Sequence, residues 1–368
     1  MTRFEYRTFF TKSLALLATI FFTGTAMADG GDSAGDEMVN TAPTEIQQPA
    51  TPPAAPAPIK HGHVKTVTQT KPHHVVTQTT VRNDTIKARI DDAKTPIISP
   101  DDALDDKSVI DARYTKENLI PPKFAISFFR PTYVMPYYYT FSPYNSIYQG
   151  NTPDDEELKH NEIKYQFSFK VPLWKSILNS PSSLYLAYTQ MSYWQAYNKY
   201  AFFRSTDYEP ELFLQTDLNK HMFGNWDFNV FSIGLVHQSN GFGNSLERSW
   251  NRAYLMGAIS NPFLMIAIKP WIIFRDSTYE RQNPHMAKYM GYEQVVIALK
   301  WKSTVISLET RNFVNGFNRS GNTLSISFPL TKYLNGYVQG FSGYGQSLIE
   351  YNHRTNSVGV GFSLSNWV

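Results

Sequence analysis

The fold of this chain is decided by Phe231-Ser-Ile-Gly-Leu-Val-His237-Gln-Ser239-Asn-Gly241, where apolar and polar residues alternate, and by a second alternating run from Trp250 to Ile259. Successive side chains of a strand point to opposite faces, so His237 and Ser239 share a face with apolar residues. The loop between the two runs is rich in Gly, Asn and Ser. This pattern predicts an antiparallel β-hairpin.

A hairpin centred near Asn244 places His237 opposite Asn251 on one face. The pair, together with Ser239, makes a Ser-His-Asn constellation in which Ser could act as nucleophile and His as base. The simpler interpretation is a rim or core histidine beside ordinary turn residues, since Ser and Asn next to Gly are common in turns. The match of the Asn to the His across the hairpin favours the catalytic interpretation.

Composition narrows the possible functions. The chain has 368 residues, no cysteine, 15% aromatic residues and a formal net charge of +3. The absence of cysteine excludes thiol catalysis, cysteine-ligated metals and disulfides. The near-balanced charge and the absence of a Lys/Arg-rich tract give no support to nucleic-acid binding.

Residues 1–28 have the features of a secretory signal peptide. Arg3, Arg7 and Lys12 precede an apolar run, and Ala26-Met-Ala28 supplies a small-x-small cleavage site. A short transmembrane anchor is the alternative, but the run is far shorter than the roughly 20 residues that a spanning helix needs. The sequence predicts export to the periplasm.

Residues 29–120 form a Pro/Thr/His-rich stretch without strand or helix periodicity, and are predicted to be a disordered arm or linker. Val67-Thr-Gln-Thr recurs from Val76, with four histidines nearby. Those histidines could bind a transition metal, but a solvated polar repeat is the favoured interpretation. No partner of the arm can be identified.

Residues 121–368 are predicted to form a twelve-stranded antiparallel transmembrane β-barrel, an all-β fold. The expected strands lie near 124–141, 162–172, 183–193, 209–216, 226–239, 250–260, 263–275, 291–300, 303–312, 322–329, 336–344 and 357–367. Aromatic residues near predicted strand ends indicate membrane interfaces, where amphipathic rings are favoured. These residues are Tyr137, Tyr138, Tyr139, Trp174, Trp194, Trp226, Trp250, Trp271, Tyr333 and Tyr337. A soluble β-sandwich or lipocalin-like barrel could show the same alternation.

The motif His237-x-Ser239-Asn-Gly241, with Arg248-Ser-Trp-Asn251-Arg252, resembles the outer membrane phospholipase A family of Gram-negative bacteria. Further matching stretches are Phe169 to Trp174, Tyr188-Thr-Gln190, Asp207-Tyr-Glu-Pro210, Lys269-Pro-Trp271, Lys288-Tyr-Met-Gly-Tyr292 and Ser342 to Asn352. The resemblance covers about residues 120–368, the whole predicted barrel, and leaves out the arm.

The resemblance implies a calcium-dependent phospholipase with A1, A2 and lysophospholipase activity on membrane phospholipids. Carried onto this chain, Ser239 is the nucleophile, His237 the general base and acid, and Asn251 the residue that orients His237. The backbone N–H of Gly241 lies in the oxyanion hole.

The resemblance also implies a calcium site and a homodimer. The ligands would be the backbone carbonyl of Phe242 and the side chain at position 247, where this chain has Glu247 in place of the family's hydroxyl. The family's further hydroxyl ligand, from a second subunit, has no Ser counterpart near Asn198 to Phe203, although Tyr200 or backbone oxygens could replace it. Gln190 matches a polar residue at the dimer interface, and its alternative is a polar residue facing the barrel interior.

Two other classes compete with the hydrolase. A pore-forming barrel explains the alternation but gives no reason for Ser239, His237 and Asn251 to share the outer face. A structural or adhesive barrel, with the arm as its active part, accounts better for residues 29–120. The expected location in each case is the Gram-negative outer membrane.

Overall fold

The structure is a computed structural model that describes residues 108–110, 113 and 126–368. All of them belong to one compact unit. The predicted signal peptide, 1–28, and the predicted arm, 29–120, lie outside the described residues except for 108–110 and 113. No helix within the described residues is long and apolar enough to span a membrane.

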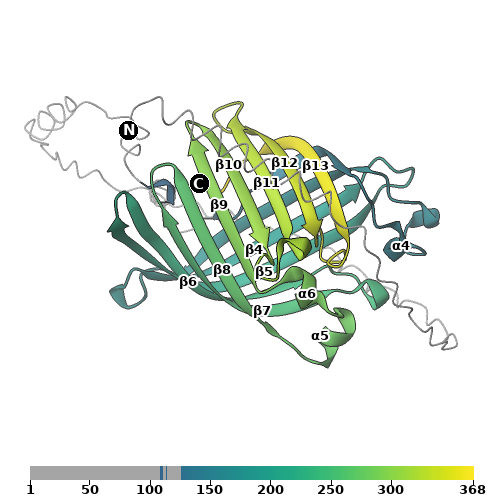
Figure 1. Cartoon of the computed structure of the whole chain (residues 1–368), viewed down its shortest axis with the longest axis horizontal. Helices are drawn as coiled ribbons and strands as arrows, with labels where there is room; N and C mark the ends of the chain where they lie inside the picture. Colours follow the sequence, from purple (N-terminus) through teal and green to yellow (C-terminus); the bar gives the residue numbers. More distant parts are fainter. Residues whose placement is uncertain (1–107, 111–112, 114–125) are drawn as a thin grey trace, which may run out of the picture. The chain divides into compact units, whose positions relative to one another are not determined.

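Twelve antiparallel strands form a closed barrel, as predicted (Figure 1). They are β2 (Tyr133–Thr140), β3 (Asn161–Trp174), β4 (Ser182–Gln195), β5 (Phe202–Phe223), β6 (Trp226–Ser239), β7 (Ser249–Ser260), β8 (Leu264–Phe274), β9 (Glu293–Trp301), β10 (Thr304–Arg311), β11 (Gly321–Pro329), β12 (Asn335–Tyr344) and β13 (Arg354–Ser363). Each strand pairs with its neighbour in sequence, and β13 pairs with β2 to close the ring. A short additional strand, β1 (Ser127–Phe128), pairs with β3.

The two ends of the barrel differ in their connections. Five connections of two to seven residues join strands at one end, and six connections of six to twenty residues join them at the other. The longer loops carry the helices α4 (Asn145–Tyr148), α5 (Ser277–Gln282) and α6 (Met286–Met290), which Figure 1 shows away from the C-terminus. In outer-membrane barrels the short turns face the periplasm and the longer loops face outward.

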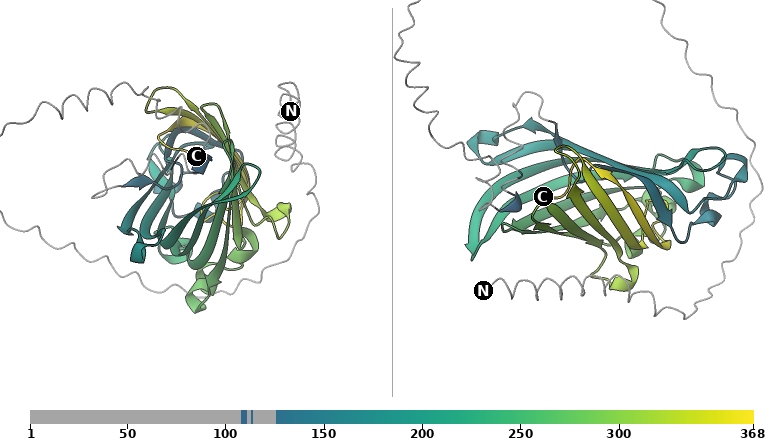
Figure 2. Two further views of the ribbon diagram at one scale, coloured as in Figure 1. Left: turned by 90° about the vertical axis from the view of Figure 1, so that its left-hand side faces the viewer. Right: turned by 90° about the horizontal axis from the view of Figure 1, so that it is seen from above.

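The interior of the barrel is polar and crowded. Arg130 pairs with Glu209 and Glu211, and Lys269 pairs with Glu211 at 2.8 Å. Arg204 pairs with Glu162 at 2.7 Å. Most of the large apolar side chains on the outer face are exposed instead. Figure 2 shows the strands that carry them as one continuous sheet around the barrel. This inside-out arrangement is that of a membrane barrel, and it excludes the soluble alternatives, which bury their apolar face.

The short-turn end of the barrel is filled from within. Val109 and Ile110 are buried in one apolar cluster with Val230 and Met265, against which Trp367 packs. Val109 N–H donates to the Asn261 carbonyl at 3.0 Å, and Asn229 donates to the Ser108 hydroxyl at 2.9 Å. The packed part of the chain therefore begins before residue 121.

Several predicted features need correction. Strand β5 has 22 residues rather than the predicted eight, because it also includes the seven residues before Glu209 and the seven after Thr216, several of them charged. The last strand ends at Ser363, and Trp367 lies beyond it. Four aromatic residues expected at membrane interfaces are instead buried, because the side-chain parity of their strands points them into the barrel: Trp250, Trp271, Tyr138 and Tyr337. Trp174 and Tyr333 are exposed, as expected.

Candidate functional site

The predicted register of the β6–β7 hairpin is confirmed: His237 pairs directly with Asn251. Nδ1 of His237 lies 2.8 Å from Oδ1 of Asn251. An amide oxygen can only accept, so this contact requires the proton on Nδ1. It leaves Nε2 of the neutral imidazole as a proton acceptor.

His237 lies on the outer face of the barrel. The preceding residues of the same face, Phe231, Ile233 and Leu235, are 39%, 51% and 53% exposed. Ser239 follows His237 on this face at the strand end, where it pairs with Tyr208 of β5. The hydroxyl, the imidazole and the amide therefore share a face that is otherwise apolar.

The loop after Ser239 is held by Asn240, which is buried. Its side-chain oxygen accepts from the backbone N–H groups of Phe242 and Arg248 at 3.3 and 3.0 Å, and its amide donates to the Leu246 carbonyl at 2.7 Å. Gly241 follows with a φ of +66°. A Cβ at Gly241 would lie 2.8 Å from Cε2 of Tyr208, so the position requires glycine for both conformation and space.

Phe242 and Glu247, the predicted calcium ligands, are half-buried residues in this loop. Arg248 donates to the carbonyls of Ser245 and Glu247 at 2.8 and 2.7 Å, which directs its charge onto the loop backbone. No group of three or more His, Asp or Glu side chains suited to a metal occurs within residues 108–110, 113 and 126–368. The Phe242 carbonyl and the Glu247 carboxylate are hard oxygen donors of the type that calcium prefers.

Gln190 lies on the outer face of β4, which excludes the alternative of an inward-facing residue. Tyr188 OH donates to its side-chain oxygen at 3.0 Å, and its amide donates to the Ser192 hydroxyl at 3.2 Å. Ser192 also accepts from Thr206 at 3.1 Å. Since Gln190 pairs with Tyr208, and Tyr208 pairs with Ser239, a polar row runs across the outer face from Gln190 to the hairpin.

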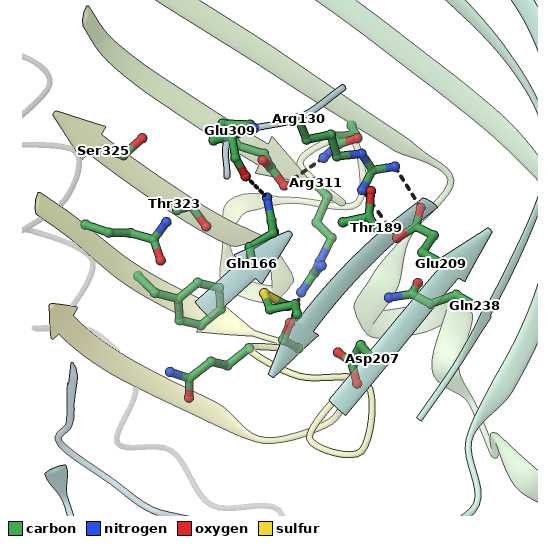
Figure 3. Close-up of a pocket in the computed structure, with 18 of the residues that line it drawn as sticks. Arg130, Gln166, Thr189, Asp207, Glu209, Gln238, Glu309, Arg311, Thr323 and Ser325 are labelled. Carbon is green, nitrogen blue, oxygen red and sulfur yellow. Dashed lines mark hydrogen bonds and ion pairs between the residues drawn. The ribbon is translucent and has the colours of Figure 1, made fainter. Parts of the chain in front are cut away.

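A second set of residues, which the sequence analysis did not identify, lies directly behind the hairpin. Gln238, Trp250 and Arg252 alternate with the outer residues and point into the barrel, where they line a cavity of about 120 Å³. Figure 3 shows Gln238 beside Glu209 in this cavity. The only signal in the sequence is parity: each of these residues is adjacent to a member of the Ser-His-Asn set.

The loop between β8 and β9 supports the start of β7. Asn283, which is fully buried, donates to the carbonyls of Ser249 and Tyr279 at 2.7 and 3.0 Å. The Ser249 hydroxyl donates to the Gln282 side chain at 3.3 Å. This end of the hairpin is therefore fixed by contacts outside its own two strands.

Comparison with known proteins identifies relatives. The Phospholipase A1 family model matches residues 111–364. "Phospholipase A1" of Escherichia coli K12 is 38% identical over 216 residues, which are 57% of this chain and 72% of the relative. "Putative phospholipase A1" of Neisseria meningitidis serogroup B is 35% identical and is matched over 64% of both chains.

Two solved structures are similar throughout the barrel. Outer membrane phospholipase A from E. coli and the Salmonella typhi outer membrane phospholipase dimer with bound calcium each give a TM-score of 0.61 at 34% identity. Each match covers 66% of this chain and 92% of the solved chain. The barrel is thus one of the Gram-negative outer membrane, and the chain belongs to the phospholipase A1 family.

Proposed function

We propose that this protein hydrolyses the acyl ester bonds of glycerophospholipids and lysophospholipids, with A1 and A2 selectivity, at the outer face of the β6–β7 hairpin. The observation that carries the proposal is the contact of His237 Nδ1 with Asn251 Oδ1 at 2.8 Å, on the same face as Ser239. The apolar surface around these three side chains suits a substrate with acyl chains.

In the proposed mechanism, His237 Nε2 takes the proton of the Ser239 hydroxyl as Oγ attacks the ester carbonyl. The same imidazole then returns the proton to the leaving alcohol, and the cycle repeats with water to release the fatty acid. Asn251 holds the ring and its tautomer. It lacks the charge of an Asp, but a carboxylate on a lipid-facing surface would be costly to desolvate.

The oxyanion is assigned to the backbone N–H of Gly241. The left-handed conformation of this glycine and its close approach to Tyr208 support a fixed N–H direction at this point. Each well-placed donor of this kind contributes about 3 kcal/mol to the stabilisation of the transition state.

Calcium is assigned to the same loop, with the Phe242 carbonyl and the Glu247 carboxylate as ligands. The hard oxygen donors fit this ion, and the remaining ligands would come from water and a second subunit. When bound, calcium would supply positive charge near the oxyanion. The known dimer with bound calcium from S. typhi supports this assignment.

A homodimer through the outer face of β3 to β6 would complete the site. Gln190 and its hydroxyl neighbours form a polar row within an exposed apolar surface, which suits a self-complementary contact. Tyr200, which is 44% exposed in the loop between β4 and β5, is a candidate ligand from the partner subunit.

In the proposed domain organisation, residues 1–28 direct export, residues 29–120 form a connecting arm whose Val109 and Ile110 pack into the barrel, and residues 121–368 carry the enzyme. The alternatives to this proposed function are a non-catalytic pore and a structural or adhesive barrel. Retained phospholipase activity after deletion of residues 29–100 would support this division, whereas a deletion that abolishes activity of a folded barrel would contradict it.

The proposed function is tested by fatty acid release from phospholipid in detergent micelles, with wild type beside Ser239→Ala, each with calcium and with chelator. Loss of the nucleophile should reduce kcat by about 10⁴-fold or more. Chelator should abolish wild-type activity, and activity that survives chelator would contradict the assignment of calcium. Activity of Ser239→Ala equal to wild type would overturn the mechanism, and an inactive wild type in a folded, dimeric preparation would overturn the function.

A further inference from the structure

We propose that Gln238, Trp250 and Arg252 are positioning residues that set the geometry of the catalytic side chains from the opposite face of the barrel wall. This inference rests on the proposed function, because it concerns how Ser239, His237 and Asn251 are held. The three residues are called the inner brace below.

The inner brace joins strands β6 and β7 through side chains. The side-chain oxygen of Gln238 accepts from Trp250 Nε1 at 2.8 Å and from Arg252 Nη2 at 3.1 Å. Gln238 pairs with Trp250 in the hairpin register, and Arg252 pairs with Val236. One acceptor on β6 therefore binds two donors on β7.

The inner brace is itself anchored to the rest of the barrel. Arg252 Nη2 also lies 3.3 Å from Glu209 of β5, and Glu209 pairs with Arg130 at 2.8 Å. The Arg252 guanidinium lies 4.0 Å from the Trp250 ring centroid and 5.2 Å from that of Trp271. Trp250 and Arg252 are 2% and 6% exposed, so these contacts are shielded from water. Polar contacts are stronger in such a buried environment than in water.

Sequence spacing links the inner brace to the catalytic face. Gln238 lies between His237 and Ser239, and Asn251 lies between Trp250 and Arg252. Adjacent side chains of a strand share the same stretch of backbone, so fixing the inner ones fixes the Cα positions of the outer ones. On the outer face, His237 and Asn251 are joined to each other by one hydrogen bond at an exposed position. The rigidity of the catalytic pair therefore comes from inside the barrel.

The side-chain oxygen of Gln238, which accepts from both Trp250 and Arg252, is the group to substitute. Gln238→Leu keeps the approximate side-chain size but leaves the Trp250 and Arg252 donors without this acceptor. Gln238→Glu keeps an acceptor oxygen and faces the Arg252 guanidinium, so it should restore the geometry. Gln215→Leu is the matched control: Gln215 is a buried inward-facing amide of β5, whose side chain donates to Asp217 at 2.8 Å away from the site.

The experiment measures kcat and KM in micelles with saturating calcium, together with the rate at which a sulfonyl fluoride labels Ser239. For Gln238→Leu we expect kcat and the labelling rate to fall together by about 100-fold, the effect of displacing a reacting group by about 1 Å. KM should be unchanged, because the lipid surface is unaltered. Gln238→Glu and Gln215→Leu should stay near wild type in both measurements.

Heat-induced mobility shift on gels reports folding of each variant. If Gln238→Leu does not fold, Trp250→Phe, which keeps one aromatic ring and removes the N–H donor together with the rest of the indole, should slow labelling of Ser239 to an intermediate rate. The inner brace is overturned if the folded variant keeps wild-type kcat, if only KM changes, or if Gln238→Glu is as slow as Gln238→Leu. Ser239→Ala in the same assay separates the two claims: full activity of that variant refutes the proposed function itself.

Discussion

The two faces of the β6–β7 hairpin are built on opposite principles. On the outer face, His237 contacts Asn251 within an exposed apolar surface. On the inner face, Arg252 takes part in a buried network with Glu209 and Arg130. Chemistry needs accessible groups, and precise placement needs buried contacts. A barrel wall one strand thick supplies both, because adjacent residues reach different environments.

We expect the largest loss of stability from substitution of a buried ionic residue inside the barrel. Glu211→Leu leaves Arg130 and Lys269 without a carboxylate that contacts both, and breaking such a buried pair costs about 3–5 kcal/mol. Urea unfolding of the barrel in lipid vesicles measures the difference. Asp227→Asn, which removes the exposed pair of His221 and Asp227, is the control and should cost less than about 1 kcal/mol. Equal losses for the two variants would show that burial does not distinguish them.

On the outer face, stability should be lowered by the introduction of a charged side chain rather than by the loss of a hydrogen-bond or ion-pair partner. Ile233→Arg places a cation on the lipid-facing surface near the middle of β6, at a cost of about 2–4 kcal/mol in a bilayer. Ile233→Leu is the matched control and should change little. The same unfolding measurement applies, and a neutral effect of Ile233→Arg would contradict the assignment of this face to apolar surroundings, whether lipid or the proposed partner subunit.

The proposed oxyanion donor on the outer face depends on the left-handed backbone conformation of Gly241. Gly241→Ala should cost about 1–2 kcal/mol of local strain, because φ is +66° and the new Cβ would meet the Tyr208 ring. The loop must shift to relieve the contact, so kcat should fall as well. Gly243→Ala, at a position with open space, is the control. Wild-type kcat in Gly241→Ala would argue against the assigned oxyanion donor.

The smallest expected effect is at Asn251. Asn251→Ala removes one neutral hydrogen bond to His237, worth about 1 kcal/mol, so kcat should fall by roughly fivefold. Stability should hardly change, since the side chain is exposed. Paired measurements of kcat and of the unfolding midpoint test this separation. A large loss of stability would mean that Asn251 is structural.

Much of the fold follows from alternation along the strands. The register of His237 with Asn251 was predictable because a hairpin pairs residues that are close in sequence. The inward direction of Trp250 and Trp271 was not, because a large aromatic residue near a strand end suits either a membrane interface or a packed interior. The length of β5 was also missed, since the seven residues at each of its ends include charged residues, such as Arg204, Asp207 and Lys220, that interrupt the apolar alternation.

The inner brace could not be predicted in full, because its partners come from distant segments. Gln238 and Trp250 belong to one hairpin, and Glu209 lies on the adjacent strand β5, but Arg130 comes from a segment before β2. Sequence parity indicates that Gln238 faces inward. It does not indicate which ionic groups of other strands meet it there.

Closure by β13 and β2 also has a consequence for the order of assembly. Ser357 pairs with Thr140 across more than half of the chain, whereas the β6–β7 hairpin joins neighbours. Contacts between distant segments carry the larger loop-closure entropy and form late. We therefore expect the β6–β7 hairpin to form before the Arg130 anchor is in place behind it. On this order, the catalytic side chains reach their final positions only after the last strand has met the first.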